Sequence, residues 1–377
     1  MVRRNVFRSL QRLWVAVGLV LLTLVLLGSL ASRVPAIYER RSRADLIRLL
    51  ANRAYPGEQW VGEYFHELWR VRAAWHSYVY WRGKPFRGKF INIDENGLRH
   101  TWRASPVPSQ GSVRIFMFGG SGMWGVGARD DFTIPSLVSK KLHNAGMRDA
   151  WVVNFGEIGY VSTQEVIALM LELQRGNLPD IVVFLDSYND ALSALENGTA
   201  GLPMHEENRI AEFNLRQRLN WRGYVEGRAL FKLIRRIAGA QRVRAEADPD
   251  LPKRVVDVYL ANTRTVQILA DRFGFAALFF WQPGVHDKNS PTPLEEKLRR
   301  QREDMFALEV DKALERALQS GRDHVEIRDL ARVFDDDQGT LFIDQVHVSE
   351  KGMERLAEAI FSAVAQAYKS KRVPTPR

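Results

Sequence analysis

The chain contains no cysteine among its 377 residues, so disulfide bonds and thiolate metal sites are excluded. Its eight histidines are scattered and show neither the H-E-x-x-H nor the H-x-x-E-H spacing, so we expect no catalytic metal and no cofactor. The formal net charge of +10 is spread over arginine-rich segments instead of one tail. That charge is compatible with anionic membrane surfaces or glycans, but no nucleic-acid-binding motif accompanies it, so we predict no nucleic-acid partner. The sequence does not indicate an oligomeric state.

The N-terminal segment is the longest stretch without charge. Residues Leu13–Ala31 are mostly aliphatic and follow Arg3, Arg4, Arg8 and Arg12. About 20 apolar residues suffice for a transmembrane helix, and preceding basic residues favour retention of the N-terminus in the cytoplasm. We therefore predict a single-pass anchor within residues 1–34, with the remainder on the periplasmic face of a bacterial inner membrane. A signal peptide cleaved after Ala31 is the alternative.

The region from residue 35 to 111 differs in composition from the C-terminal two thirds of the chain. It is rich in aromatic residues, which could stack on sugars or pack this juxtamembrane region against the main domain: Trp69, Trp75, Tyr78, Tyr80 and Trp81. The segment Phe90–Leu98 alternates into an Asn-Gly pair, which indicates a tight turn between strands. Residues 104–111 read as a linker.

Residues 112–377 alternate between apolar runs and amphipathic segments. We predict five strands: Val113–Phe118, Trp151–Asn154, Ile181–Leu185, Ala276–Trp281 and His324–Ile327. Between and after them we predict helices at about 134–145, 162–176, 255–273, 293–319 and 349–368. This alternation predicts an α/β fold: a parallel sheet flanked by helices, a flavodoxin-like three-layer sandwich. Residues 191–250 interrupt the pattern as an insertion, which we expect to form a lid or to pack on the domain. Its segment Tyr224–Ala238 is basic and amphipathic, and contact of this segment with the membrane is the third alternative.

Three residues suggest nucleophilic chemistry. Ser121 follows the first strand, and Asp344 and His347 lie three positions apart before the last helix. A serine hydroxyl needs a histidine to accept its proton and an aspartate to orient the imidazole. We therefore predict Ser121, His347 and Asp344 as a catalytic triad.

Two further loops offer hydrogen-bond donors for a developing oxyanion. Gly159 follows the second strand and Asn189 follows the third. A glycine lets its backbone N–H approach closely, and an asparagine side chain donates without net charge. We predict that Gly159, Asn189 and the backbone of Ser121 form an oxyanion hole.

Together these blocks make the chain resemble the SGNH (GDSL-type) hydrolase family over roughly residues 113–368. Ser121 matches the nucleophile, Gly159 and Asn189 match the oxyanion donors, and Asp344 and His347 match the last block. The sequence departs from the family at Gly120, where the family has aspartate, and before Asn189, where it has Tyr188 instead of glycine. The resemblance implies a serine esterase or O-acyltransferase that acts through an acyl-serine.

The loop Gly120–Gly125 also satisfies G-x-G-x-x-G, the dinucleotide fingerprint. That fingerprint requires a helix beginning within the motif and an acidic residue about twenty positions later. We expect the next helix only near Thr133, and the later positions are basic or amide, so we disfavour this alternative. The α/β-hydrolase elbow is excluded because Met123 stands where G-x-S-x-G requires glycine.

The predicted function is thus a membrane-anchored serine esterase or acyltransferase, with acylated envelope glycans or small esters as substrates. The alternative is a non-catalytic envelope binding or assembly protein that retains the fold. His205 and His286 lie in loops, and we expect both to be incidental, although His286 follows a strand and could line the cleft.

Overall fold

A computed structural model describes Asp45, Leu49 and residues 53–104, 107–218, 248–320 and 325–372. The chain divides into two units, residues 1–62 and 63–377. The predicted anchor Leu13–Ala31 and the amphipathic segment Tyr224–Ala238 lie outside the described residues. Within the described part of the chain, no helix is both long enough and apolar enough to cross a membrane.

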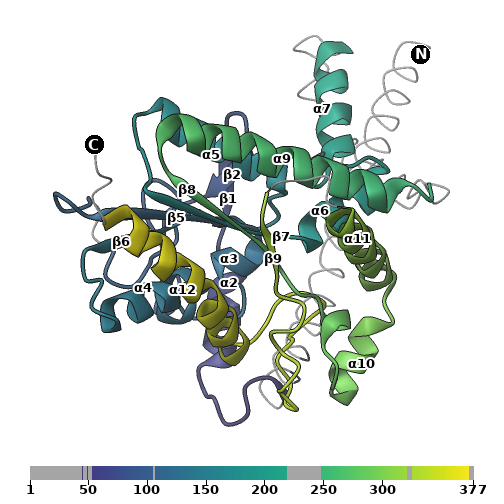
Figure 1. Cartoon of the computed structure of the whole chain (residues 1–377). Coiled ribbons are helices and arrows are strands. Elements are labelled where there is room, and N and C mark those ends of the chain that lie inside the picture. Colours follow the sequence, from purple (N-terminus) through teal and green to yellow (C-terminus); the bar gives the residue numbers. More distant parts are fainter. Residues whose placement is uncertain are drawn as a thin grey trace, which may run out of the picture. The chain divides into compact units, whose positions relative to one another are not determined.

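A five-stranded parallel sheet forms the centre of the second unit (Figure 1). Its strands, in spatial order, are β6 (Ala150–Asn154), β5 (Val113–Gly119), β7 (Ile181–Asp186), β8 (Ala276–Trp281) and β9 (Ile327–Asp329). β5, the first strand of this sheet along the chain, therefore lies between β6 and β7, which is the flavodoxin-like order. The predicted parallel sheet is confirmed, although its last strand begins later than expected.

Helices cover both faces of the sheet because alternate residues of each strand point to opposite sides. In β5, Ile115 and Met117 belong to the core with α4 (Ile134–Asn144) and α12 (Glu350–Arg372). Phe116 and Phe118 belong to the opposite core with α5 (Ser162–Gln174) and α9 (Leu251–Phe273). The central strands β7 and β8 are almost entirely apolar because helices cover both of their faces, whereas the edge strand β9 is only partly buried.

Three helices lie at one side of this sandwich: α6 (Tyr188–Asn197), α10 (Pro293–Arg299) and α11 (Arg302–Gln319). Apolar residues of α6, α9 and α11 form a third core with Trp281. We expected one helix over 293–319, and this was wrong. The chain leaves helical geometry at Gln301, whose extended backbone precedes α11.

The aromatic region contains α2 (Val61–Leu68) and short strands β1 (Ala73–His76), β2 (Tyr80–Gly83), β3 (Phe86–Arg87) and β4 (Asn92–Ile93). β1 pairs with β2, and β3 pairs with β4. The Asn-Gly pair forms the expected tight turn, in which Gly97 N–H donates to Asp94. Trp81 packs against Tyr160, but Trp75 and Tyr78 stay exposed, so packing explains only some of these aromatic side chains.

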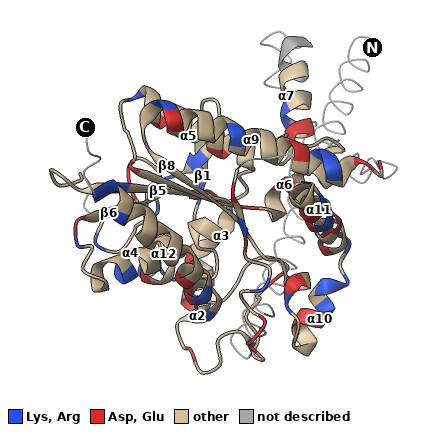
Figure 2. Cartoon of the chain, in the orientation of Figure 1, with Lys and Arg blue, Asp and Glu red and all other residues tan. Residues whose placement is uncertain are grey.

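Charged side chains of both signs are interspersed over the helices, as Figure 2 shows for α5, α9, α10 and α11. The short helix α3 (Ser121–Trp124) carries no charge, and all four of its residues are buried. It begins at Ser121, earlier than we expected, and the left-handed Gly125 ends it after one turn. α7 (Glu206–Arg218) lies within the predicted insertion.

Candidate active site

The predicted nucleophile lies where the order of the sheet reverses. Ser121 follows β5 and Ser187–Asn189 follows β7, the two neighbouring strands from which the chain leaves in opposite directions. In doubly wound sheets, such a switch point opens a crevice beyond the carboxyl ends of the strands. A narrow recess there is lined by Ser121, Tyr160, Asn189 and Gln282, among others.

Ser121, His347 and Asp344 form a continuous hydrogen-bonded chain. The Ser121 Oγ lies 2.6 Å from His347 Nε2, and His347 Nδ1 lies 2.6 Å from Asp344 Oδ2. With Nδ1–H donating to the carboxylate, Nε2 is free to accept the hydroxyl proton. Ser121 is 7% exposed, so the hydroxyl is close to the surface of the recess but shielded from bulk water. This arrangement can generate a serine nucleophile.

The base and its orienter lie in one tight loop. Asp344 Oδ1 accepts the backbone N–H groups of Val346 at 3.0 Å and His347 at 2.8 Å. Ile343 N–H donates to the His347 carbonyl at 2.9 Å and closes the loop. Loss of water contact raises the pKa of Asp344, but the His347 imidazole and these N–H groups outweigh it and hold that pKa below its ordinary value. The carboxylate is therefore ionised.

Gly120 leaves space that a side chain would fill. A side chain here would place its Cβ 2.1 Å from Nδ2 of Asn189. The bare backbone thus lets the asparagine amide pack directly beside the nucleophile. Asn189 Nδ2 donates to the Tyr160 carbonyl at 2.8 Å, which uses one of its two hydrogens. The predicted role of Asn189 as an oxyanion donor falls to the other hydrogen.

Gly159 adopts a left-handed backbone with φ of +80°. It lies beside Trp81 and Met204, and it is not among the described residues that line the recess with Ser121. Its neighbour Tyr160 lines the recess and accepts the Asn189 bond. The role of the Gly159 N–H as an oxyanion donor stays a prediction.

Replacing Asn189 with alanine is expected to lower kcat by about 10²–10³-fold, the usual loss for one oxyanion donor. KM should change little, because the amide is aimed at charge that develops after binding. Steady-state kinetics on an aryl ester measure both constants. Asn197→Ala is the control, since Asn197 lies in the same helix and its amide also donates to backbone carbonyls. A rise in KM at unchanged kcat would make Asn189 a recognition residue instead.

The loop of Asp344 and His347 is supported by residues that sequence analysis missed. Gln282 Nε2 donates to the Val346 carbonyl at 3.2 Å. Glu295 accepts the N–H groups of Leu341 and Phe342 at 2.9 and 3.1 Å, and the fully buried Lys288 Nζ lies 2.8 Å from Glu295. The neighbouring sequence does not reveal such a buried pair, since each residue alone looks like a surface charge.

Three buried carboxyl groups belong to Glu165, Asp186 and Asp190, and the last two of these residues line the recess. Asp190, next to Asn189, accepts from the Ser162 hydroxyl at 2.6 Å. Burial, and after it the charge of Asp190, raises the pKa of Asp186 to about 8. Burial and then Asp186 itself raise the pKa of Glu165 well above its ordinary value. Neighbouring buried carboxyls cannot all ionise, so Glu165 and Asp186 hold at least one proton between them.

Replacing Glu165 with glutamine should make stability less dependent on pH. Because burial raises the pKa of Asp186 from 3.8 to about 8, the folded protein keeps a proton that the unfolded chain loses, and stability falls as pH rises from the first value to the second. A glutamine can donate to Asp186 as a protonated carboxyl does, without having to lose a proton. We expect the thermal melts of both proteins to agree best near pH 4, and the wild type to lose more stability than the variant between about pH 4 and pH 8. An equal loss of stability with rising pH in both proteins would contradict a proton shared between Glu165 and Asp186.

His286, which we expected to be incidental, is buried and paired with carboxylates. With Asp287 and Asp311 it forms, in the described residues, a group whose ligand atoms lie close enough for a metal ion. Both ring nitrogens, however, already contact carboxylates: Nδ1 that of Asp304 and Nε2 that of Asp311. The sequence signal was the spacing of Asp304 and Asp311, which lie seven residues apart and so share one face of α11.

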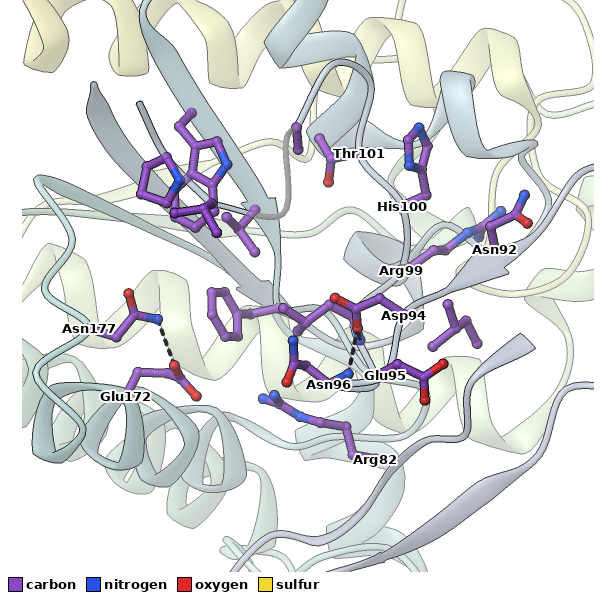
Figure 3. Close-up of a pocket in the computed structure, with 18 of the residues that line it drawn as sticks. Arg82, Asn92, Asp94, Glu95, Asn96, Arg99, His100, Thr101, Glu172 and Asn177 are labelled. Atoms are coloured by element: carbon purple, nitrogen blue, oxygen red, sulfur yellow. Dashed lines mark hydrogen bonds between the residues drawn. The ribbon is translucent and has the colours of Figure 1, made fainter. Parts of the chain in front are cut away.

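A larger cavity, of about 880 Å³, lies along the edge strand β6, away from the recess that Ser121 lines (Figure 3). In that view Arg82, Glu95 and Asn96 lie on one side and Glu172 and Asn177 on another. None of Ser121, His347 and Asp344 lines it. We therefore place the chemistry at the smaller recess, where the nucleophile and the base meet.

No family model and no curated protein matches the chain. Among solved structures, it is similar to the acetyl xylan esterase AlAXEase, with 16% identity, 66% of this chain and 98% of the other covered, and a TM-score of 0.41. A carbohydrate acetylesterase from Sinorhizobium meliloti shows 14% identity, coverages of 67% and 98%, and a TM-score of 0.38. An acetylxylan esterase from Geobacillus stearothermophilus shows 16% identity, with 67% of this chain and 95% of the other covered, and a TM-score of 0.36.

At these identities and TM-scores, the chemistry must be inferred from this chain's own side chains. The fold and the site define a class: a doubly wound α/β protein with a Ser–His–Asp constellation at the switch point of its sheet.

Proposed function

We propose that this chain is a serine esterase or O-acyltransferase of the SGNH type. The hydrogen-bonded chain from Ser121 through His347 to Asp344 carries the proposal, with both of its distances at 2.6 Å. A binding protein has no need of a histidine that accepts a serine proton beside an ionised aspartate. The resemblance of the four sequence blocks to the SGNH family agrees with this geometry.

In the proposed reaction, Ser121 Oγ attacks the carbonyl carbon of an ester while His347 Nε2 takes the hydroxyl proton. Asp344 stabilises the imidazolium, and the Asn189 amide stabilises the oxyanion. His347 then returns the proton to the leaving alcohol, which leaves an acyl-Ser121. Water or a sugar hydroxyl, deprotonated by His347, attacks this acyl group and frees the serine.

We further propose an acylated polysaccharide of the cell envelope as substrate. The solved structures with which the chain aligns include an acetyl xylan esterase and a carbohydrate acetylesterase, which agrees with this class of substrate. The test is twofold: labelling of the full-length chain by a fluorophosphonate, and release of acetate from acetylated xylan and from short-chain aryl esters. A folded protein that is not labelled at Ser121 would favour the binding or assembly protein.

The location is likewise a proposal: Leu13–Ala31 anchors the chain, and residues 35–377 face the periplasm. Four arginines before the apolar segment favour this orientation. We expect alkaline phosphatase fused after Tyr368 to be active and a fused cytoplasmic reporter to be inactive. Protection of the domain from protease in spheroplasts would reverse the orientation, and a mature N-terminus at Ser32 would indicate a cleaved signal peptide.

A further inference from the structure

His286 sits in the 3₁₀ turn η2 (Val285–Asp287), directly after β8. Its side chain is 5% exposed, and its ring lies between two carboxylates of α11. Nδ1 is 2.8 Å from Asp304 Oδ1, and Nε2 is 2.5 Å from Asp311 Oδ2. Trp281 at the end of β8 donates to the other oxygen of Asp311 at 2.7 Å. We call His286, Asp304 and Asp311 the histidine clamp.

His286 carries the positive charge of the clamp and lies among carboxylates. Burial lowers the pKa of His286, but the hydrogen bonds to Asp304 and Asp311 outweigh it and bring that pKa to about 10. Asp287 in the same turn also acts on the His286 ring, and Asp329 at the end of β9 acts in turn on Asp287. Tyr188 of α6 lies near both Asp304 and Asp344. Since both ring nitrogens must donate to satisfy the two carboxylates, the ring is an imidazolium at neutral pH.

The same turn holds the loop between the proposed base and its orienter. Val285, next to His286, donates its N–H to the carbonyl of Gln345 at 2.8 Å. Gln282, three residues earlier, donates to the carbonyl of Val346 at 3.2 Å. Gln345 and Val346 are the two residues between Asp344 and His347. The position of the turn therefore sets the position of both catalytic side chains in that loop.

We infer that His286 is a positioning residue: by fastening the η2 turn to α11 through Asp304 and Asp311, it holds the Asp344–His347 loop in register with Ser121. The inference rests on the proposed function. Neither His286 nor the two clamp carboxylates contacts Ser121 or His347 in the structure, so the clamp acts through the backbone of Val285. Misplacement of catalytic groups by about 1 Å costs about 10²-fold in rate, and the clamp is one of the contacts that prevents it.

The test compares His286→Gln with the wild-type full-length chain on a p-nitrophenyl ester. Active sites are first counted by stoichiometric fluorophosphonate labelling, so that kcat refers only to folded, reactive protein. We expect kcat per labelled site to fall by about 10- to 100-fold at unchanged KM. His205→Gln is the matched control and should leave both constants unchanged, because His205 also pairs with a carboxylate, Glu196, but on the exposed surface.

Asp304→Asn provides a second, nearly isosteric variant should His286→Gln fail to fold. Since both residues act through one clamp, the double variant should be scarcely slower than either single variant. An unchanged kcat per labelled site in His286→Gln or Asp304→Asn, or additive losses in the double variant, would overturn the inference while leaving the esterase intact. A wild-type chain that is neither labelled nor active would overturn the proposed function itself, and the positioning role with it.

Discussion

Replacing Ser121 or His347 with alanine is expected to lower kcat by about 10⁶-fold, as removal of the nucleophile or base does in serine hydrolases. The two side chains share one proton, which passes across the 2.6 Å between Ser121 Oγ and His347 Nε2. The double variant should therefore be scarcely slower than either single variant. Asp344→Asn should lose less, about 10⁴-fold, because the aspartate orients and stabilises the imidazole without accepting the proton.

Hydrolysis of an aryl ester by the full-length variants measures these losses, and thermal unfolding shows whether the fold survives. His205→Ala is the control, since it removes another histidine that is paired with a carboxylate. Additive losses from Ser121 and His347 would argue against a shared proton transfer. Full activity in Ser121→Ala would place the nucleophile elsewhere.

Replacing Lys288 with methionine should destabilise the protein by about 3–5 kcal/mol, because it leaves Glu295 as an uncompensated buried charge. Neither side chain of this pair is exposed at all. Burial raises the pKa of Glu295, but Lys288 and the backbone N–H groups of Thr292, Leu341 and Phe342 outweigh it, so that the pKa lies below its ordinary value. The carboxylate is therefore ionised and needs its cation.

Urea unfolding of the full-length chain measures this loss. Lys312→Met is the matched control, because Lys312 pairs with Glu309 on the exposed face of α11 and such pairs contribute about 0–1 kcal/mol. Adding Glu295→Gln to Lys288→Met should restore part of the stability, since the unpaired charge is then removed. Equal effects of the Lys288 and Lys312 substitutions would show that the buried pair contributes no more than a surface pair.

Local patterns in the sequence predicted most of the elements of the sheet. The strand Ala276–Trp281 matches its predicted bounds, and the strand predicted at Ile181–Leu185 extends by one residue to Asp186. Such runs are recognisable because both faces of a parallel strand are buried, which makes the strand apolar throughout. The break at Gln301 was missed because the charged pattern on either side of it remains helical. The Gln301 side chain bonds Gln345, a long-range contact that no local pattern reveals.

The candidate site was predictable only in part, because some of its contacts join residues that are far apart in the sequence. Ser121, Asn189, Asp344 and His347 could be selected because each lies at the end of a strand or in a loop, where polar side chains meet the carboxyl edge of the sheet. His286 looked incidental because its two partners lie 18 and 25 residues further along the chain. The buried carboxyls Glu165 and Asp186 were missed because a single charged residue in a sequence gives no sign of its burial.

The sequence by itself determined the alternation of strands and helices and the chemical types available at the strand ends, because periodicity and turn chemistry are local properties. Only the tertiary structure decided that β5 lies between β6 and β7, which opens the crevice, and that Ser121 meets a histidine 226 residues away. It also decided which charges are buried in pairs, as in Lys288–Glu295 and the histidine clamp. These outcomes depend on how layers pack and on which donors reach which acceptors, and no stretch of neighbouring residues encodes that.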